Sequence, residues 1–447
     1  MIRFLTAFYI TIVFISTAGA ESYRFGLKDA ISAAVEKNNR VRAAGFMSEA
    51  ALQAVSIVTS RYYPSISLEE SFSVSNSPTQ TFMMKLDESR FTQNDFLINN
   101  LNRPGIQHDF STALTVRQPL YDPSISPAKE IAARESEIQE TRLDGAKHET
   151  AFRVFKLYLD IQKAQARLRA AEQAVYEARE HVRLAGVRNQ AGTGLRSDEL
   201  RARTHLSANE QQLVSARNNL TISRMELANA IGLKDVDKID ITDTRIAAIP
   251  LTKSLEELVA LSLENNIELK QSLAEYEKSK AAVRLARSGY LPSAGAFASY
   301  RMNSKDTPFW NDNDSWNAGV ALTWQLFDGS RRSHERDKAV AEKSAAAELH
   351  EHAKREAGMR VRESYLRSEE MGKRLEVAGN TLQDAEETVR LLTRRFENSL
   401  ATMAELLDAQ TALNRTRADL VDSEAHLALA RGYVYYSAGI FLKEMTK

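Results

Sequence analysis

Two stretches of the chain alternate between apolar and polar residues with the period of two that predicts a β-strand. After Pro64 the apolar positions are Ile66, Leu68, Phe72 and Val74, and serines and a glutamate fill the positions between them. After Pro292 the apolar positions are Ala294, Ala296, Ala298, Tyr300 and Met302. Returning strands follow, with Phe110, Leu114 and Val116 in one and Trp316, Val320 and Leu322 in the other. The pattern predicts one strand pair over 64–119 and another over 292–325.

Most of the remaining sequence has helical periodicity. Leucines recur every seven residues over 206–227 and 406–427, and Val434 continues the second series to 434; apolar residues over 378–396 are spaced four and three in turn. Both spacings are typical of a coiled-coil seam. Residues 128–185 and 332–396 contain no proline, and each segment would reach roughly 90 Å as a helix. A compact domain needs no helix of that length, so the sequence predicts long antiparallel coiled coils.

A repeat covers nearly the whole chain. A shift of 228 residues places 27–41 on 255–269 and Tyr62-Tyr-Pro-Ser65 on Tyr290-Leu-Pro-Ser293. The match of Leu120-Tyr-Asp122 to Leu326-Phe-Asp328 needs a shift of 206, so the first copy carries 22 extra residues. We interpret the chain as a duplicated unit, with one repeat over 21–250 and the second over 251–447. Each repeat contains a helix, a strand pair and long helices.

The first twenty residues, MIRFLTAFYITIVFISTAGA, have the layout of a secretory signal peptide. One positive charge, Arg3, precedes an apolar core, and small residues stand at the expected cleavage site before Glu21. A retained anchor is the alternative, but the apolar run is short for a spanning helix. No later window of about twenty apolar residues follows. We therefore expect an exported protein that no helix holds in the inner membrane.

The amino-acid composition argues against nucleic-acid binding, metal binding and catalysis. Lys plus Arg and Asp plus Glu both number 59, so the net charge is zero, and glycine (18) and proline (9) are scarce. Mixed charge with few helix breakers is typical of long helices, and neutrality argues against a nucleic-acid partner. The chain has no cysteine, and its most closely spaced histidines, His350 and His352, are two residues apart, a poor spacing for a metal site on a helix. With no catalytic arrangement and no GxxxxGK[ST] loop, we expect no enzyme, cofactor or metal.

The alternating strands have two interpretations. They could form a soluble sheet that packs on its own core, or a transmembrane sheet whose apolar face meets lipid. The helices have their own seams, so no amphipathic element is left to cover the sheet. Four strands cannot close a barrel, and lipid does not permit an open edge. We therefore predict an α+β membrane protein in which three chains contribute four strands each to one β-barrel.

The returning strands end in similar short motifs. We call these motifs the strand-to-helix exits. The first consists of Tyr121 and Asp122, and the second of Phe327, Asp328 and Gly329. At each exit the chain would leave the membrane and begin a periplasmic helix. The aromatic residue can lie at the membrane edge, and the aspartate can cap the helix that follows.

At these residues the chain resembles the outer membrane efflux protein family, the TolC-like channel-tunnels. The resemblance covers about 25–441 and rests on the tyrosine-x-proline-serine strand openings, the exits and the duplication. It implies a homotrimer with a twelve-stranded barrel in outer-membrane lipid and a long helical barrel in the periplasm, tapering to a closed inner end. It also implies a periplasmic adaptor (membrane fusion) protein and an inner-membrane pump, either proton-driven (RND) or ATP-driven (ABC). The insert over 82–120 resembles the family's first extracellular loop.

The resemblance places the closed end at two turns, over 189–203 and 396–410. Glu405 and Asp408 match two acids that line the family's narrowest constriction, and their i,i+3 spacing puts them on one helix face. Threefold symmetry would make a ring of six acids that attracts cations. Ser197 and Asp198 stand in the place of a hydroxyl–acid pair that helps to latch the gate. The alternative is that these are ordinary solvated helix residues.

The chain departs from the family prototype at the latch. Ala401 replaces its arginine and Phe396 replaces its tyrosine. Arg196, Arg394 or Arg395 are candidate substitutes for the missing arginine.

The leading hypothesis is a passive outer-membrane duct of a tripartite system that exports small molecules. Type I protein secretion is the alternative within the same architecture, and the sequence does not separate the two. A periplasmic coiled-coil scaffold without a channel is an alternative from another class, and an exported enzyme is the weakest one.

Overall fold

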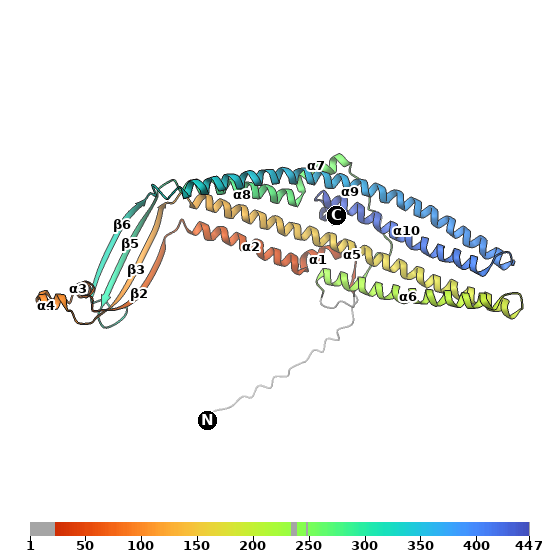
Figure 1. The fold of residues 1–447 in the computed structure, drawn as a ribbon, viewed down its shortest axis with the longest axis horizontal. Helices are drawn as coiled ribbons and strands as arrows, with labels where there is room; N and C mark the ends of the chain where they lie inside the picture. Colours follow the sequence, from red (N-terminus) through yellow and green to blue (C-terminus); the bar gives the residue numbers. More distant parts are fainter. Residues whose placement is uncertain (1–22, 234–238, 247–248, 447) are drawn as a thin grey trace, which may run out of the picture. The chain divides into compact units, whose positions relative to one another are not determined.

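The computed structural model describes residues 23–233, 239–246 and 249–446. The predicted signal peptide, residues 1–20, lies outside the described residues. The chain divides into two compact units. Unit 1 takes its residues from 1–43, 144–266 and 356–447, and unit 2 consists of 44–143 and 267–355. Two very long helices contribute residues to both units (Figure 1).

The main elements occur in the same order twice. The first series is α1 (Leu27–Lys37), α2 (Asn39–Ser60), β2 (Ser65–Ser75), β3 (Gln107–Tyr121), α5 (Ile125–Gln190) and α6 (Arg196–Ile231). The second series is α7 (Leu255–Asn265), α8 (Ile267–Ser288), β5 (Ser293–Ser304), β6 (Asn313–Thr323), α9 (Arg331–Glu397) and α10 (Met403–Ser437). The lengths agree closely: α1 and α7 have 11 residues each, α2 and α8 have 22, and α5 and α9 have 66 and 67.

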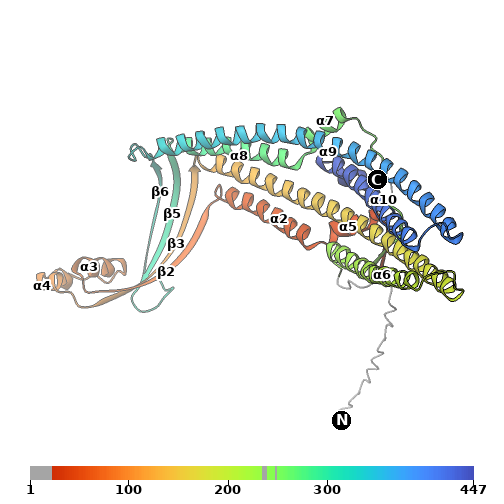
Figure 2. The same ribbon diagram turned by 45° about the vertical axis from the view of Figure 1, so that its right-hand side comes forward.

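Unit 2 contains a four-stranded antiparallel sheet in the order β2-β3-β5-β6 (Figure 2). The register aligns one row of apolar side chains across all four strands, formed by Leu68, Leu114, Tyr300 and Trp316. None of the described residues covers this face, and Leu68 is 63% and Trp316 77% exposed. The neighbouring row on the opposite face is polar and consists of Ser67, Thr115, Ser299 and Asn317.

One row interrupts the apolar face. It contains Glu70, Thr112, Met302 and Asp314. The Thr112 hydroxyl donates a hydrogen bond to the Glu70 carboxylate, and Thr112 is buried. The simple alternation read from the sequence omitted this glutamate, which lies between Leu68 and Phe72 on the apolar face.

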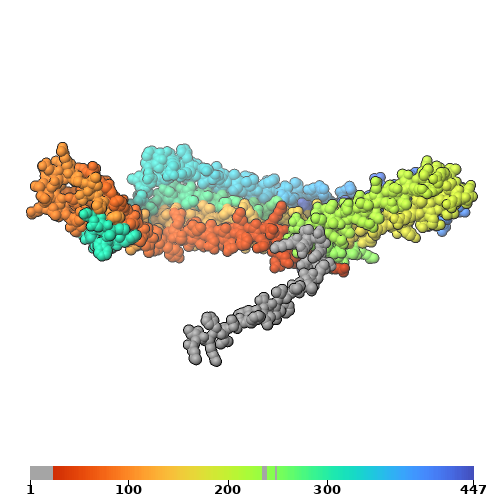
Figure 3. All heavy atoms as spheres, turned by 90° about the horizontal axis from the view of Figure 1, so that it is seen from below, coloured from red at the N-terminus to blue at the C-terminus, as the bar shows by residue number. Residues whose placement is uncertain are grey.

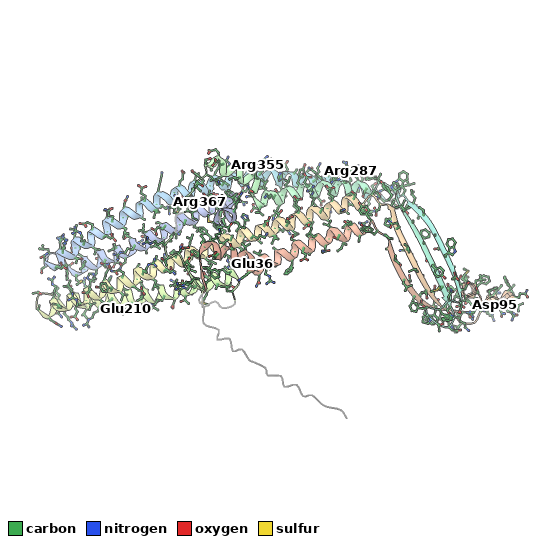
Figure 4. All side chains as sticks on the ribbon, turned by 180° about the vertical axis from the view of Figure 1, so that it is seen from behind. Glu36, Asp95, Glu210, Arg287, Arg355 and Arg367 are labelled. Atoms are coloured by element: carbon green, nitrogen blue, oxygen red, sulfur yellow. The ribbon has the colours of Figure 1, made fainter. Side chains whose placement is uncertain are left out.

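The insert between β2 and β3 is helical. It holds α3 (Pro78–Asp87), a 3-10 turn η1 (Gln93–Phe96) and α4 (Ile98–Asn102). The rings of Phe82, Phe91 and Phe96 pack edge to face, with centroids 4.5–6.4 Å apart. Lys85 of α3 forms an ion pair of 2.7 Å with Asp95, which Figure 4 labels in this insert.

Unit 1 has its core around α1, the middle of α5 and the ends of α6 and α10. The largest fully buried side chains there include Phe155, Tyr158, Leu227 and Phe441. Two short strands, β1 (Tyr23–Phe25) and β4 (Ile239–Ile241), pair in parallel, and a short helix α11 (Phe441–Met445) closes the chain. Tyr158 donates a hydrogen bond of 2.9 Å to Asp243, and burial raises the Tyr158 pKa to about 12. This contact fastens the segment after β4 to α5.

The long helices of unit 1 form two hairpins, α5 with α6 and α9 with α10 (Figure 1). The residues of α6, yellow-green in Figure 3, cover the right-hand part of the face drawn there. On α9 the predicted seam positions over 378–396 are less exposed than the residues between them. Within the described part of the chain, no helix combines the length and the apolar character needed to span a bilayer.

Candidate gate at the two hairpin turns

The turn between α5 and α6 has the same geometry as the turn between α9 and α10. Gly192 has φ +72° and Ser399 has φ +61°, both left-handed. The next residue in each turn donates its N–H to a carbonyl five residues earlier: Thr193 to Arg188 at 3.0 Å, and Leu400 to Arg395 at 2.7 Å. This is the pattern of a helix that ends in a left-handed C-cap. Serine is the unusual choice, because residues other than glycine rarely adopt this conformation.

A small hydrophobic cluster joins the two hairpins beside these turns. Its buried members are Ala185, Ala202, Phe396, Met403, Leu406 and Leu407, which come from α5, α6, α9 and α10. Phe396, at the position of the family tyrosine, is only 4% exposed. The cluster excludes water from the junction and so fixes one turn against the other.

Arg188, in the last turn of α5, crosses from the first hairpin to the second. Its guanidinium donates to the Phe396 carbonyl oxygen and, at 2.7 Å, to the Ser399 hydroxyl oxygen. The guanidinium carbon also lies 4.7 Å from the centre of the Phe396 ring. A planar guanidinium suits this combination of two hydrogen bonds and a ring contact.

The arginines expected to replace the latch have local partners instead. Arg196 pairs with Glu199 at 3.1 Å within α6, and Arg395 donates to Leu400 O at 3.2 Å within its own turn. At Arg394 only the backbone takes part in this turn: its carbonyl oxygen accepts hydrogen bonds from the N–H and the side-chain amide of Asn398. Next to the turns, Arg188 makes a polar contact between the two hairpins, and the sequence analysis did not nominate it.

Glu405 and Asp408 lie on the exposed surface in the first turns of α10. The Glu405 carboxylate accepts hydrogen bonds from the Thr402 N–H at 2.7 Å and the Thr402 hydroxyl at 2.9 Å. The Thr402 hydroxyl in turn accepts the Glu405 N–H at 3.2 Å, which completes a capping box. The hydrogen bond from the Thr402 N–H, with that from its hydroxyl, lowers the Glu405 pKa. Glu405 thus has a capping role as well as an exposed negative charge.

Ser197 is exposed and Asp198 is half-buried in the first turn of α6. The strongly held acid is the next residue, Glu199, which is 6% exposed. It accepts hydrogen bonds from Asn189 at 2.9 Å and from Arg196 and Arg203, and the Asn189 hydrogen bond with these two cations lowers its pKa. Glu199 therefore fastens the start of α6 to the end of α5.

The strand-to-helix exits lie in unit 2. Asp122 accepts the Ser124 N–H at 2.9 Å, just before α5, and pairs with Arg61 at 3.3 Å. Asp328 accepts the N–H of Arg332, in the first turn of α9, at 3.2 Å. Tyr121 and Phe327, which precede the two aspartates, are exposed.

The second exit is held by more contacts than the first. Gly329 has φ +68°, a left-handed conformation that favours glycine. Arg332 donates to Asp328 at 2.9 Å and to the carbonyl oxygens of Gly289 and Leu326, each at 3.0 Å. These bonds tie the start of α9 to the end of α8 and to the segment after β6.

Among the residues that the structure describes, no group of three or more histidine, aspartate or glutamate side chains is placed to hold a metal ion. The geometry at the turns provides a packed junction, an arginine bridge and exposed acids. Such an arrangement can hold helix ends together and attract cations.

Comparison with known proteins identifies a family whose model matches most of the chain. The family model described as outer membrane efflux protein matches residues 30–233 and 258–439. The proteases secretion protein PrtF of Dickeya chrysanthemi is 22% identical over 441 residues, which cover 97% of this chain and 92% of PrtF. The outer membrane protein TolC of Vibrio cholerae is 26% identical over 356 residues, which cover 74% of this chain and 80% of TolC.

Solved structures have the same fold. The outer membrane channel CmeC of Campylobacter jejuni matches with a TM-score of 0.75 at 15% identity, covering 100% of this chain and 98% of that one. A membrane protein from Pseudomonas aeruginosa matches with a TM-score of 0.78 at 17% identity, covering 92% and 93%.

Proposed function

The chain belongs to the outer membrane efflux protein family, and from this premise we propose that it is the passive exit duct of a tripartite export machine. The protein is an outer-membrane channel component that extends into the periplasm, as its family and relatives indicate. The family is one of channels and not of enzymes.

The sheet carries the proposal. Within the described residues its apolar face is uncovered, its opposite face is mostly polar, and its edge strands β2 and β6 have no strand partner beyond the sheet. In lipid each edge must be paired. Three chains joined β6 to β2 would make a closed barrel of twelve strands, so we propose a homotrimer. The apolar row would face lipid and the polar row would face the water-filled lumen.

We also infer that the chain arose by duplication of one unit, over 21–250 and 251–447. The matched order and lengths of the elements support this, as does the shared geometry of the turns at Gly192 and Ser399. Six hairpins in a trimer would then give the periplasmic part of the duct a near-regular wall.

At the inner end we propose that Glu405 and Asp408 form the cation-attracting ring, with Ser197 and Asp198 beside it. Arg188 would hold the two hairpins of one chain together until the machine opens. The Ser399 hydroxyl and the Phe396 carbonyl are neutral acceptors, so this hold would depend little on salt.

Partners follow from the architecture. A passive duct has no energy source of its own, so an inner-membrane pump must drive export, and a periplasmic adaptor must join pump to duct. The pump would be proton-driven (RND) or ATP-driven (ABC).

Two cargo classes remain, small molecules and proteins. The sequence placed small molecules first. The similarity to a proteases secretion protein over nearly the full length of both chains favours protein cargo, delivered by an ATP-driven pump. Deleting the gene and measuring both the secreted proteins and the sensitivity to toxic small molecules would decide between them.

The duct itself is tested with the purified full-length protein in detergent. We expect a trimer by mass measurement and discrete ion conductance in planar bilayers. A monomer that is salt-extractable and electrically silent would instead identify a periplasmic scaffold.

A further inference from the structure

Two half-buried histidines lie near enough to interact electrostatically where three helices of unit 1 meet. His181 lies on α5 and His205 on α6. The third helix, α10, contributes the buried Gln410, and Thr411 beside it. The histidines lie at most about three helical turns from the ends of the α5–α6 turn. We call these four residues the histidine junction.

The contacts of His205 fix its protonation state. Asn209, which is buried, donates its amide to the His205 carbonyl oxygen at 2.8 Å and to the ring atom Nδ1 at 3.2 Å. A carbonyl oxygen only accepts, so the atom that faces it is the Asn209 NH₂ group. Nδ1 must therefore carry a lone pair, and the proton is on Nε2, which lies 3.5 Å from the Thr411 hydroxyl. A second proton on Nδ1 would break the bond from Asn209.

A second proton on His181 would also lack a hydrogen-bond acceptor. Its Nε2 is buried and has no hydrogen-bond partner among the described residues. Burial lowers the His181 pKa, and the Glu177 and Glu180 carboxylates with a hydrogen bond to Gln410 only partly oppose this. Burial also lowers the His205 pKa, and a charge on His181 would lower it further.

The surrounding charges already have partners. Glu177 accepts hydrogen bonds from Gln410 and, at 3.3 Å, from Arg417 of α10. Glu180 pairs with Arg183 at 2.8 Å. A cavity of about 380 Å³ beside His181 is also lined by Glu386 and Arg390 of α9. On α6 the nearest acid in sequence, Glu210, which Figure 4 labels, pairs with Arg179 at 3.2 Å.

We propose that the histidine junction is a proton-sensitive fastening: acidification charges one or both rings and separates α6 from α5 and α10. A proton on His205 breaks the Asn209 bond, and a proton on His181 leaves a charged N–H without a partner. The two charges would also repel each other. The histidine junction lies next to the hydrophobic cluster that joins the hairpins, so its separation would also loosen the gate. This effect on the gate rests on the proposed function, whereas the separation of the helices does not depend on it.

The direction follows from linkage. Both folded pKa values lie below the unfolded value near 6.5, so the unfolded chain binds more protons in this range. The junction contributes its full stability above that pH and loses it as the pH falls from there toward the folded pKa values.

The absence of cysteine allows a direct test on the full-length protein. Spin labels on Ser207→Cys of α6 and Ala412→Cys of α10, both exposed positions, report one distance within a chain. The labelled chain is produced together with an excess of the cysteine-free chain, so that an oligomer rarely contains two labelled chains and the measured distance is one within a single chain. The distance is measured at about pH 8 and about pH 5, on either side of the usual imidazole range.

We expect the distance to lengthen by on the order of 2 Å and to broaden at the lower pH. The double variant His181→Gln/His205→Gln should remove this response, and the control His426→Gln, at an exposed position on α10, should keep it. Asn209→Ala should move the response to higher pH, because Nδ1 is then free to take a proton. The same distance at both pH values, or a response that survives the double variant, would overturn the proposal. Because the readout needs no conductance, it is independent of whether the duct hypothesis holds.

Discussion

The Arg188 guanidinium donates a hydrogen bond of 2.7 Å to the Ser399 hydroxyl, joining residues 211 positions apart in the chain. This bond and the one to the Phe396 carbonyl connect the turn of one hairpin to the turn of the other. Hydrogen bonds from a charged donor typically contribute about 1.5–3 kcal/mol. Because Arg188 is half-buried, we place its contribution at the lower end.

The first prediction concerns this bridge. Arg188→Ala should weaken the hold between the hairpins by about 1.5 kcal/mol, which is roughly a tenfold change in an open-to-closed ratio. Single-channel recording in planar bilayers should show more frequent or larger openings. Arg183→Ala is the matched control, because Arg183 pairs with Glu180 on its own helix. If the two variants have the same conductance as the parent, Arg188 does not hold the gate.

A second prediction separates the bridge from general packing. In a double-mutant cycle, Arg188→Ala and Ser399→Ala should not be additive, because each removes the same hydrogen bond. Arg188→Lys should rescue little, because an ammonium cannot make both bonds and the ring contact of a planar guanidinium. Full additivity in the opening rates would show that the two residues act independently.

The third prediction concerns the proposed ring of Glu405 and Asp408. The double variant Glu405→Gln/Asp408→Asn should reduce cation selectivity, measured as the reversal potential in a salt gradient. Glutamine at 405 can keep the capping bonds to Thr402, so the start of α10 should stay intact. Asp419→Asn, a single neutralisation further along α10, serves as the control. Unchanged reversal potentials in the double variant would contradict the assignment of Glu405 and Asp408 to the cation-attracting ring.

The pH dependence of this selectivity has a defined sign. The bonds from Thr402 lower the pKa of Glu405 below its usual 4.5, so the carboxylate stays charged as the pH falls through that value. The contribution of Glu405 to selectivity should therefore persist at pH 4.5 and disappear only in stronger acid. Loss of selectivity well above that pH would point to a different group.

Much of the fold could be predicted from the sequence because it rests on periodicity. The strands begin directly after Pro64 and Pro292, where the alternation begins, and the long helices follow the proline-free segments. The insert helices α3 and α4 were not predicted. They are short, and α3 and η1 are held by the packing of Phe82, Phe91 and Phe96, which spacing along the chain does not reveal. The three-residue strands β1 and β4 are likewise too short to give a pattern.

The candidate site divides in the same way. The i,i+3 spacing was enough to predict that Glu405 and Asp408 share a helix face, although their role stays a prediction. Arg188 could not be found by looking for complementary charge, because its acceptors are a backbone carbonyl and a hydroxyl. Only the repeat pointed to this position. A shift of 207 residues places Arg188 on Arg395, which the sequence analysis named as a candidate substitute for the missing latch arginine.

Two helix glycines of unit 1 provide the fourth prediction. A Cβ on Gly432 of α10 would lie 2.4 Å from the ring of the buried Phe155, whereas a Cβ on Gly379 of α9 would meet nothing within 4 Å. Gly432→Ala should destabilise the protein by about 1–3 kcal/mol through overpacking. Gly379→Ala should stabilise it by up to about 1 kcal/mol, because alanine is the better helix former. Thermal unfolding of both variants checks the pair, and equal shifts would contradict the packing described around Phe155.

The fifth prediction tests which face of the sheet meets lipid. Leu68 and Ser67 are neighbours on β2, but Leu68 lies in the apolar row with Trp316 and Ser67 lies in the polar row with Thr115. An arginine near the bilayer midplane on the lipid face of a barrel costs about 2–4 kcal/mol, whereas the lumen face is in water. Leu68→Arg should therefore reduce the amount of the proposed homotrimer that assembles in the outer membrane. Ser67→Arg should assemble normally and lower cation conductance, because it adds positive charge to the lumen. The reverse result, with Ser67→Arg failing to assemble and Leu68→Arg tolerated, would mean that the apolar row packs against protein rather than lipid.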